Sequence, residues 1–348
     1  MEPLTDLFGT AQQWLFEAVV QPMVFALGLG GWLEDAFVAT GWLLVGLLQI
    51  AAMLLLIAPL QRLRPVEPVT DRPAIRTDVL YTLIHRLGLF RLVLFFSLEP
   101  WMDDLFGWLR VAGLSTWHLD GLWPGVTDRA WVSFVLYLMV FDFVDYCIHR
   151  GQHRFQWWWN LHALHHSQRQ MTMWSDNRNH LLDDLLRDVI LVAVAQLIGV
   201  GPGQFVAIVA LTQLSENFHH ANLRLWFGRV GERLWVSPRF HRRHHSIGIG
   251  HEAQPRRATG PSHGTAAPSG GSAAHEAAGP GARQLGGVNF GVLLPWWDML
   301  FGTADFALRY DPTGIRDQVE PGSRGVRDYG RGFWRQQWLG VLRLVGRA

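Results

Sequence analysis

The chain contains few of the residues on which many cofactor sites depend. Its 348 residues include one cysteine, Cys147, which excludes an internal disulfide, a thiolate zinc site and a cysteine-held iron–sulfur cluster. Lysine is absent, so all 30 basic residues are arginines, and a formal net charge of +1 argues against a nucleic-acid partner. Neither the HExxH sequence of zinc hydrolases nor a nicotinamide-binding fingerprint occurs. Any bound metal must therefore be held without sulfur.

Apolar sequence is abundant instead, with 49% hydrophobic residues and 18 tryptophans, which favours a membrane protein. Residues 37–60 carry no charge and are long enough to cross about 30 Å of hydrocarbon. We expect a weaker span at residues 79–100 and a further span at residues 130–148. Residues 185–218 contain two shorter apolar stretches that flank the sequence GPG, which predicts a helical hairpin that dips into the bilayer and returns. Residues 4–30 are apolar in patches and fit an interfacial or re-entrant segment as well as they fit a membrane span, so the topology of residues 1–36 stays open.

The distribution of arginine orients these segments. Four arginines lie between residues 62 and 76, directly after the first span, and an excess of arginine in a short loop marks the cytoplasmic side. The later spans then return the chain to this side at His149 and, after the hairpin, at His219. The N-terminal residues lack the basic region and the small-residue cleavage site of a secretory signal, so we expect them to stay in the mature chain.

Composition divides the chain into three expected parts. Residues 1–128 are membrane and interfacial helices, residues 129–303 form a histidine-rich catalytic domain, and residues 304–348 are an interfacial tail rich in arginine and tryptophan. Within the second part, residues from about 252 to 287 are rich in Gly, Ala, Pro and Ser and poor in aliphatic side chains. This composition is typical of a disordered insert.

Histidines follow the apolar segments in three clusters. Positions three or four residues apart share one face of a helix, so each cluster can present two or three imidazoles together. One octahedral ion accepts about six ligands, and the imidazoles of the three clusters exceed that number, so the pattern predicts two metal ions. The clusters are HRGQH with His149 and His153, HALHH with His162, His165 and His166, and HRRHH with His241, His244 and His245.

Other residues extend this candidate site. His219 and His220 follow the hairpin and His180 precedes it, and all three join the predicted metal-ligand set. Asp145 lies four residues before the first cluster, on the same helical face, and a ligating imidazole normally donates its second N–H to a carboxylate or carbonyl. We weigh that role for Asp145 equally with the role of a solvent-facing aspartate, and Asp298 has the same status. Imidazole suits Fe, Zn, Cu and Ni alike, so the spacing leaves the metal open.

The order of these motifs resembles the fatty acid hydroxylase/sterol desaturase superfamily of integral-membrane, non-haem di-iron oxygenases. The resemblance covers residues 149–303, from HRGQH through HALHH, HHAN and HRRHH to NFG and WDMLFGT. It places the three clusters and His220 in the family's ligand boxes, whereas NRNHLL around His180 departs from the commoner Arg-x-His-Pro form. The fold that it implies is all-α, an integral membrane helical bundle with a cytoplasmic, histidine-rich helical cap that holds two metals.

The same resemblance implies two irons, which zinc can replace in the isolated protein, and dioxygen as co-substrate. The implied reaction is hydroxylation or desaturation of a lipid C–H bond at the cytoplasmic face of a bacterial inner membrane. Because no electron-transfer motif is visible, a separate reductase, ferredoxin or cytochrome must supply electrons. A membrane haem-binding protein and a metal-transport protein remain alternatives, although both would be expected to place ligands within the spans. The sequence leaves open the lipid and the choice among hydroxylation, desaturation and cleavage.

Overall fold

The computed structural model describes residues 2–90, 98–249, 287–320 and 326–348, and every regular element in them is helical. Those residues form no β-strand, and an isolated β-bridge joins Ser246 and Thr313. The prediction of an all-α fold is confirmed for this part of the chain. The α-helices are α1 (Glu2–Leu15), α2 (Gln21–Ala26), α3 (Leu33–Ala52), α4 (Ala58–Leu63), α5 (Arg72–Arg86), α7 (Glu99–Val111), α8 (Ala130–Arg154), α9 (Gln156–His166), α10 (Leu181–Ile198), α11 (Pro202–His219), α12 (Gly228–Gly231), α13 (Pro238–His244), α14 (Trp296–Phe301) and α15 (Phe333–Leu344).

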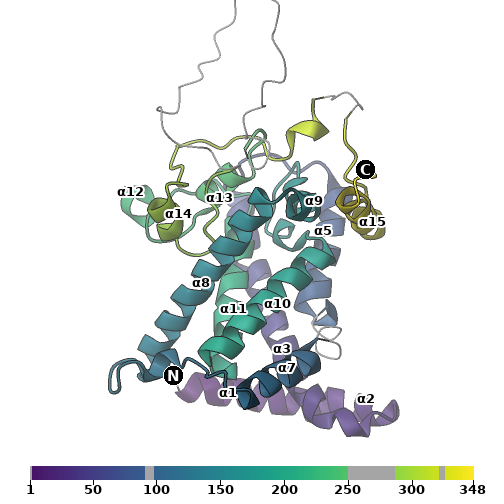
Figure 1. The fold of residues 1–348 in the computed structure, drawn as a ribbon. Helices are drawn as coiled ribbons and strands as arrows, with labels where there is room; N and C mark the ends of the chain where they lie inside the picture. The colour runs from purple at the N-terminus through teal and green to yellow at the C-terminus, as the bar shows by residue number, and fades with distance from the viewer. Residues whose placement is uncertain (1, 91–97, 250–286, 321–325) are drawn as a thin grey trace, which may run out of the picture.

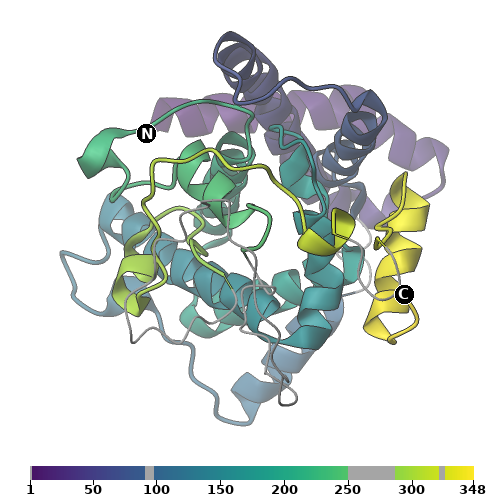
Figure 2. The same cartoon turned by 90° about the horizontal axis from the view of Figure 1, so that it is seen from above.

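Long helices form an upright bundle with shorter elements at each end (Figure 1). Helices α3, α8, α10 and α11 run along the long axis, while α1, α2 and α7 lie across one end. Helices α9, α13, α14 and α15 gather at the opposite end, termed the cap, which Figure 2 shows from above. The sequence leaves residues 1–36 open between an interfacial or re-entrant segment and a membrane span. Their first helices, α1 and α2, cross the foot of the bundle.

Two helical stretches are long and apolar enough to cross a membrane, judged by length and composition. They cover Gly30–Leu63 and Ala130–Arg154, and they contain the spans predicted at residues 37–60 and 130–148. Large apolar side chains of the first stretch face outward, and Leu55 is 73% exposed. An outward-facing apolar surface of this kind is typical of a site that contacts lipid or another protein.

The span predicted at residues 79–100 was wrong in its boundaries. Asp71 caps the first turn of α5 (Arg72–Arg86) by accepting a hydrogen bond from a backbone N–H at 3.1 Å, so the helix begins earlier than hydropathy indicates. The helix ends before Gly88, whose φ of 79° lies in the left-handed region that favours glycine. Residues 91–97 lie outside the described part of the chain.

The hairpin predicted around the GPG sequence is confirmed. Gly199 follows α10 in the left-handed conformation with a φ of 66°, and Pro202 opens α11. Both helices pack against α8 through a hydrophobic cluster that includes Phe141, Leu191 and Ile208. Helix α11 therefore returns the chain to the cap, where α8 also ends. Insertion of the hairpin into a bilayer stays a prediction.

Two further predictions concern segments near the cap. The insert predicted at residues 252–287 lies outside the described residues, apart from Gly287. Helix α15 packs against α9 and leaves Trp334 and Trp338 81% and 62% exposed. Exposed tryptophans on an amphipathic helix are compatible with the interfacial tail, which stays a prediction.

Candidate metal centre

Four segments carry the predicted ligands to one place in the cap. The first cluster occupies the last turns of α8, where His149 and His153 lie four residues apart. The second cluster occupies the end of α9. The third lies on the short helix α13, which Ser237 caps by accepting a hydrogen bond from the Phe240 N–H at 3.1 Å. Helix α11 ends beside these clusters, with His220 as its C-cap residue.

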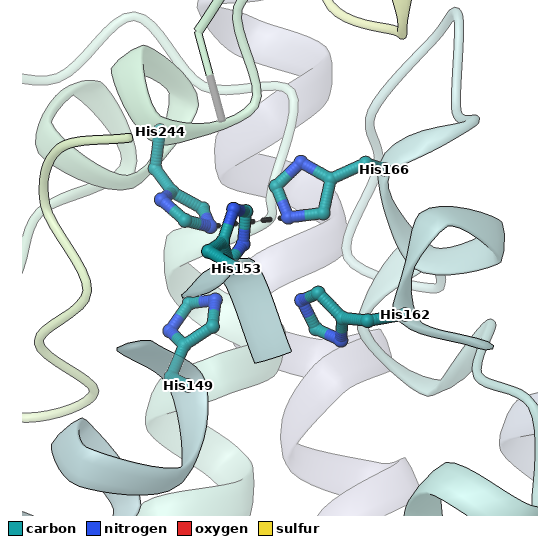
Figure 3. Close-up of side chains that lie close together, drawn as sticks. All are labelled: His149, His153, His162, His166 and His244. Atoms are coloured by element: carbon teal, nitrogen blue, oxygen red, sulfur yellow. Dashed lines mark hydrogen bonds between the residues drawn. The ribbon is translucent and has the colours of Figure 1, made fainter. Parts of the chain in front are cut away.

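The structure brings nine histidines together in two groups. Within each group, one nitrogen of every ring lies within 4.8 Å of the others, and every ring is buried. Figure 3 shows the first group, in which imidazoles from α8, α9 and α13 point toward one another. The first group is His149, His153, His162, His166 and His244, and the second group is His165, His220, His241 and His245.

The two groups adjoin. His165 and His166 are consecutive in α9 but belong to different groups. The rings of His166 and His245, one from each group, have centroids 4.2 Å apart and lie nearly parallel. Two metal ions held by these groups would therefore be neighbours, and the presence of two ions stays a prediction from the histidine count.

In the first group, backbone carbonyls decide which ring nitrogen carries the proton. His149 Nδ1 lies 2.9 Å from the Phe290 carbonyl oxygen, and His244 Nδ1 lies 2.7 Å from that of Val288. A carbonyl oxygen only accepts hydrogen bonds, so each Nδ1–H must donate, and each neutral ring keeps an unprotonated Nε2. The Nε2 atom of His149 is buried and has no hydrogen-bond partner within the described residues. Its lone pair is thus available to a metal.

The second group centres on His220. Its Nδ1–H donates to the Glu216 carbonyl oxygen at 2.7 Å, which again leaves Nε2 unprotonated. Around that Nε2 lie His165 Nε2 at 3.2 Å and His241 Nε2 at 3.0 Å, and the latter is 3.1 Å from His245 Nε2. A proton on one nitrogen can serve only one of these contacts, whereas a metal ion can accept lone pairs from all four rings.

The distances between these nitrogens fit metal coordination. Imidazole binds first-row metal ions at roughly 2.0–2.1 Å, so two such ligands at right angles lie roughly 3 Å apart. The Nε2 atoms of His166 and His244 are 3.1 Å apart, and the second-group contacts fall between 3.0 and 3.2 Å. The side chains present therefore fit two metal ions with nitrogen ligands.

Burial keeps these imidazoles neutral. Removal from water is the largest cause that lowers the pKa of His165, His241 and His245 well below the ordinary histidine value, and neighbouring imidazoles lower it further. Burial likewise lowers the pKa of His244 to about 3. At neutral pH these rings offer lone pairs and no positive charge, as metal ligation requires.

The carboxylate that supports the site differs from the one predicted. Asp145 accepts a hydrogen bond from Arg187 Nε at 2.8 Å, so its partner is a guanidinium and not an imidazole. Asp183, only 2% exposed, takes the predicted role, because its Oδ2 lies 3.0 Å from His162 Nδ1. The acidic pair in NRNHLLDD was visible in the sequence, but linear spacing connects it to no histidine cluster.

Asp183→Asn is expected to weaken metal retention in the first group by about 10–100-fold. The carboxylate accepts hydrogen bonds from Gln152 at 2.8 Å, Trp158 at 2.7 Å and His162. The Asn amide would place its own N–H donors opposite these donors, so at least one hydrogen bond would be lost. Dialysis against a graded chelator measures the retention. Asp103→Asn, on an exposed position of α7 at the foot of the bundle, is the control and should keep both ions. Equal metal retention by the two variants would show that Asp183 does not support the metal site.

The NFG and WDMLFGT motifs meet to form a loop that presents backbone carbonyls to the histidines, termed the carbonyl bracket. Asp298, which is fully buried, accepts hydrogen bonds from the N–H groups of Phe290 at 2.9 Å and Gly291 at 2.7 Å. It also accepts one from the Thr303 hydroxyl at 2.6 Å. A β-carbon at Gly291 would lie 2.9 Å from Asp298 Oδ2, so glycine is needed for this approach. Asp298 therefore acts on His149 through the backbone, because the Gly291 N–H and the Phe290 carbonyl belong to one peptide group. The peptide group of the Val288 carbonyl is held by Asn289 N–H, which donates to the Thr303 carbonyl oxygen at 2.9 Å.

Two polar residues anchor the carbonyl bracket to neighbouring helices. Asp142 on α8 accepts hydrogen bonds from the N–H groups of Leu293 at 2.8 Å and Leu294 at 3.2 Å. Asn289 donates to the Phe240 carbonyl oxygen of α13 at 2.9 Å. Neither residue is predicted from the sequence as part of the site, because neither belongs to a histidine cluster.

Two predicted ligands lie outside both groups. Nδ1 of His180 accepts a hydrogen bond from the Leu182 N–H at 3.2 Å, and Nε2–H donates to the Gln337 carbonyl oxygen at 2.9 Å. Both nitrogens are used, so His180 caps α10 and contacts α15, which corrects the predicted ligand set. His219 adjoins the second group, with its ring centroid 4.1 Å from that of His241, but it belongs to neither group.

Comparison with known proteins agrees with this geometry. Residues 134–253 match the family described as fatty acid hydroxylase. Over 124 residues the chain is 31% identical to the ornithine lipid hydroxylase OlsE of Rhizobium tropici, and the match covers 36% of this chain and 37% of that relative. No solved structure gives a significant match. Residues 134–253 contain all three histidine clusters, so the part of the chain that is similar to fatty acid hydroxylases is the part that forms the two histidine groups.

Proposed function

We propose that the protein is a membrane-bound hydroxylase that holds two iron ions and inserts one atom of dioxygen into a lipid C–H bond. The observation that carries the proposal is the pair of adjoining histidine groups, whose nine buried rings offer converging lone pairs. The superfamily supports lipid hydroxylation as the reaction class. Imidazole ligands suit several metals, and iron is proposed because hydroxylation with dioxygen needs a redox-active ion.

Each group would hold one ion through its imidazole nitrogens, and the ions when bound supply the redox chemistry that activates dioxygen. The chain's own residues orient the ligand rings and bury the site. The carbonyls of Val288 and Phe290 and the carboxylate of Asp183 orient the ligand rings and fix their tautomers. Burial of all nine histidines limits the contact of their rings with bulk water.

The proposed reaction needs electrons from outside the chain. One oxygen atom becomes the hydroxyl group of the lipid, and the other leaves as water after it takes up two electrons and two protons. The sequence contains no nicotinamide fingerprint and no cysteine set for an iron–sulfur cluster. A separate reductase, ferredoxin or cytochrome would deliver the electrons.

A membrane location supports a lipid substrate. The first histidine cluster forms the last turns of Ala130–Arg154, one of the two stretches long and apolar enough to span a bilayer. The segment from residue 62 to residue 76 holds four arginines and lies at the cap, because its Glu67 pairs with Arg242 of α13 at 2.8 Å. The positive-inside rule favours the cytoplasmic side for this loop. The proposal therefore includes a bacterial inner membrane with the metal site on its cytoplasmic face.

The alternative of a haem protein has no support from the geometry. The imidazoles pack against one another, and the ring centroids of His153 and His166 lie 4.6 Å apart. A macrocycle does not fit between rings at that separation. No feature of the described residues specifically supports the alternative of a metal transporter.

Growth under ¹⁸O₂ of cells that carry or lack the gene tests the proposed function. We expect one lipid class to gain one ¹⁸O atom per molecule, by mass spectrometry, only when the gene is present. Anaerobically purified, iron-loaded protein should hold about two irons per chain by elemental analysis. Loss of hydrogen without gain of ¹⁸O would indicate desaturation, and unchanged lipids together with one metal or none per chain would contradict the proposal.

A further inference from the structure

Three cavities meet at one arginine of α10. The first is an apolar groove between α8, α10 and α11. The second is lined by histidines of both groups, among them His149 and His165. The third is polar and extends toward α5. Arg187 lines all three, so it stands where an apolar chain, the metal ligands and a polar group can meet.

Two carboxylates hold the guanidinium of Arg187. Its Nε donates to Asp145 at 2.8 Å, and its Nη2 donates to Glu216 at 3.1 Å. Those carboxylates are 5% and 12% exposed, whereas the Arg187 side chain is 26% exposed. Across the ranges that the structure describes, the N–H groups of Nη1 have no hydrogen-bond partner. The arginine is thus fixed in place with donors left for a ligand.

The charges of Arg187, Asp145 and Glu216 indicate which kind of ligand fits beside them. Asp145 alone offsets the single positive charge of Arg187, and Glu216 is a second acidic partner, so no net positive charge is left to attract a carboxylate or a phosphate. A neutral carbonyl oxygen accepts N–H donors without bringing a further negative charge. The carbonyl of an ester or amide therefore fits this position better than a free fatty acid does.

The apolar groove follows the helix axes away from the histidines. From Arg187 it passes Leu191, one turn further along α10, and Ile208 of α11. It reaches Phe141 of α8 and Phe205 of α11, whose ring centroids are 5.4 Å apart. An acyl chain in this groove would have its far end near the foot of the bundle and its carbonyl end beside the histidine-lined cavity.

We propose that Arg187 binds the ester or amide carbonyl of an acyl lipid, and that the hydroxylated carbon lies within a few bonds of that carbonyl. This inference rests on the proposed function and deepens it, because it names the substrate class and the position of oxidation. The reaction is the balanced hydroxylation given above, with its external electron donor. Arg187 serves as a substrate-binding residue that sets which carbon approaches the metals.

Tandem mass spectrometry of the ¹⁸O-labelled lipid locates the new hydroxyl group in the product of the native enzyme. We expect it within the first few carbons from an ester or amide carbonyl. A hydroxyl group near the methyl end of the chain, or on a free fatty acid alone, would overturn the inference and leave the hydroxylase function intact. Absence of any labelled lipid would contradict the function on which the inference rests.

Arg187→Lys tests the residue itself. Lysine keeps the positive charge between the two carboxylates but lacks the planar fork, so it cannot hold both of them and a carbonyl together. We expect KM to rise about tenfold with a smaller change in kcat, and the hydroxyl position to spread over more carbons, while metal content stays unchanged. Arg309→Lys, whose side chain is 62% exposed, is the matched control. Unchanged KM and hydroxyl position in Arg187→Lys would overturn the assignment, and the native product tests the inference even where the variant does not fold.

Discussion

Replacing His220 with alanine is expected to lower the metal content from about two ions per chain to about one and to abolish lipid oxidation. The Nε2 atom of His220 lies 3.2 Å from His165 Nε2 and 3.0 Å from His241 Nε2, so the change removes the ring on which the second group centres. The five rings of the first group stay in place and keep their ion. Elemental analysis of iron-loaded protein and lipid mass spectrometry measure the two effects.

Two histidines outside the groups supply the controls for this experiment. His118 is exposed and lies beside Gly199 at the hairpin turn, so His118→Ala should keep both ions and full activity. His180 is buried and caps α10, so His180→Ala should lower the free energy of unfolding by about 1 kcal/mol without loss of an ion. Two ions and full activity in His220→Ala would exclude His220 as a ligand, and loss of an ion in His180→Ala would return His180 to the ligand set.

Asp298→Ala is expected to lower the free energy of unfolding by about 3 kcal/mol and to weaken metal binding at least about tenfold. The change leaves the N–H groups of Phe290 and Gly291 and the hydroxyl of Thr303 without their acceptor in a fully buried place. The carbonyl bracket then loses its fixed position against the two ligand histidines that it orients. Burial raises the pKa of Asp298 to about 6, so at pH 7 the carboxylate is ionised and accepts all three hydrogen bonds.

Thermal unfolding in detergent and metal titration measure the effect of Asp298→Ala. Asp328→Ala is the matched control, because this carboxylate also accepts a backbone hydrogen bond, from Gly330 at 2.7 Å, but its side chain is 58% exposed. Its loss should cost less than about 1 kcal/mol. Equal unfolding temperatures and equal metal binding in the two variants would show that the bracket does not support the site.

The helical elements were largely predictable from local sequence. A charge-free run predicts the first apolar helix because transfer of its side chains from water needs no partner from elsewhere in the chain. The hairpin is predictable because Gly199 and Pro202 act on the backbone of their own turn. The span expected at residues 79–100 has different helix boundaries for the same kind of local reason, since the cap at Asp71 and the turn at Gly88 outweigh average hydropathy.

The ligand residues were predictable for a related reason. An α-helix brings side chains three or four residues apart to one face, so each histidine cluster is already arranged by its own helix. Nine of the eleven histidines predicted as ligands, all except His180 and His219, lie in the two groups. The imidazole chemistry, the excess of ligands over one ion and the resemblance to the superfamily all follow from residues that are close in sequence.

The sequence by itself therefore determined the helical class and nine of the histidines that gather in the two groups, and it predicts two metal ions from their number. Only the tertiary structure decided how the ligands divide and what orients them. It assigns the consecutive His165 and His166 to different groups, gives His162 the partner Asp183, and gives His149 the carbonyl of Phe290, 141 residues away in the chain. The physical reason is that helix geometry fixes only neighbours within a turn, whereas partners far apart in sequence are set by how α8, α9, α13 and the carbonyl bracket pack together.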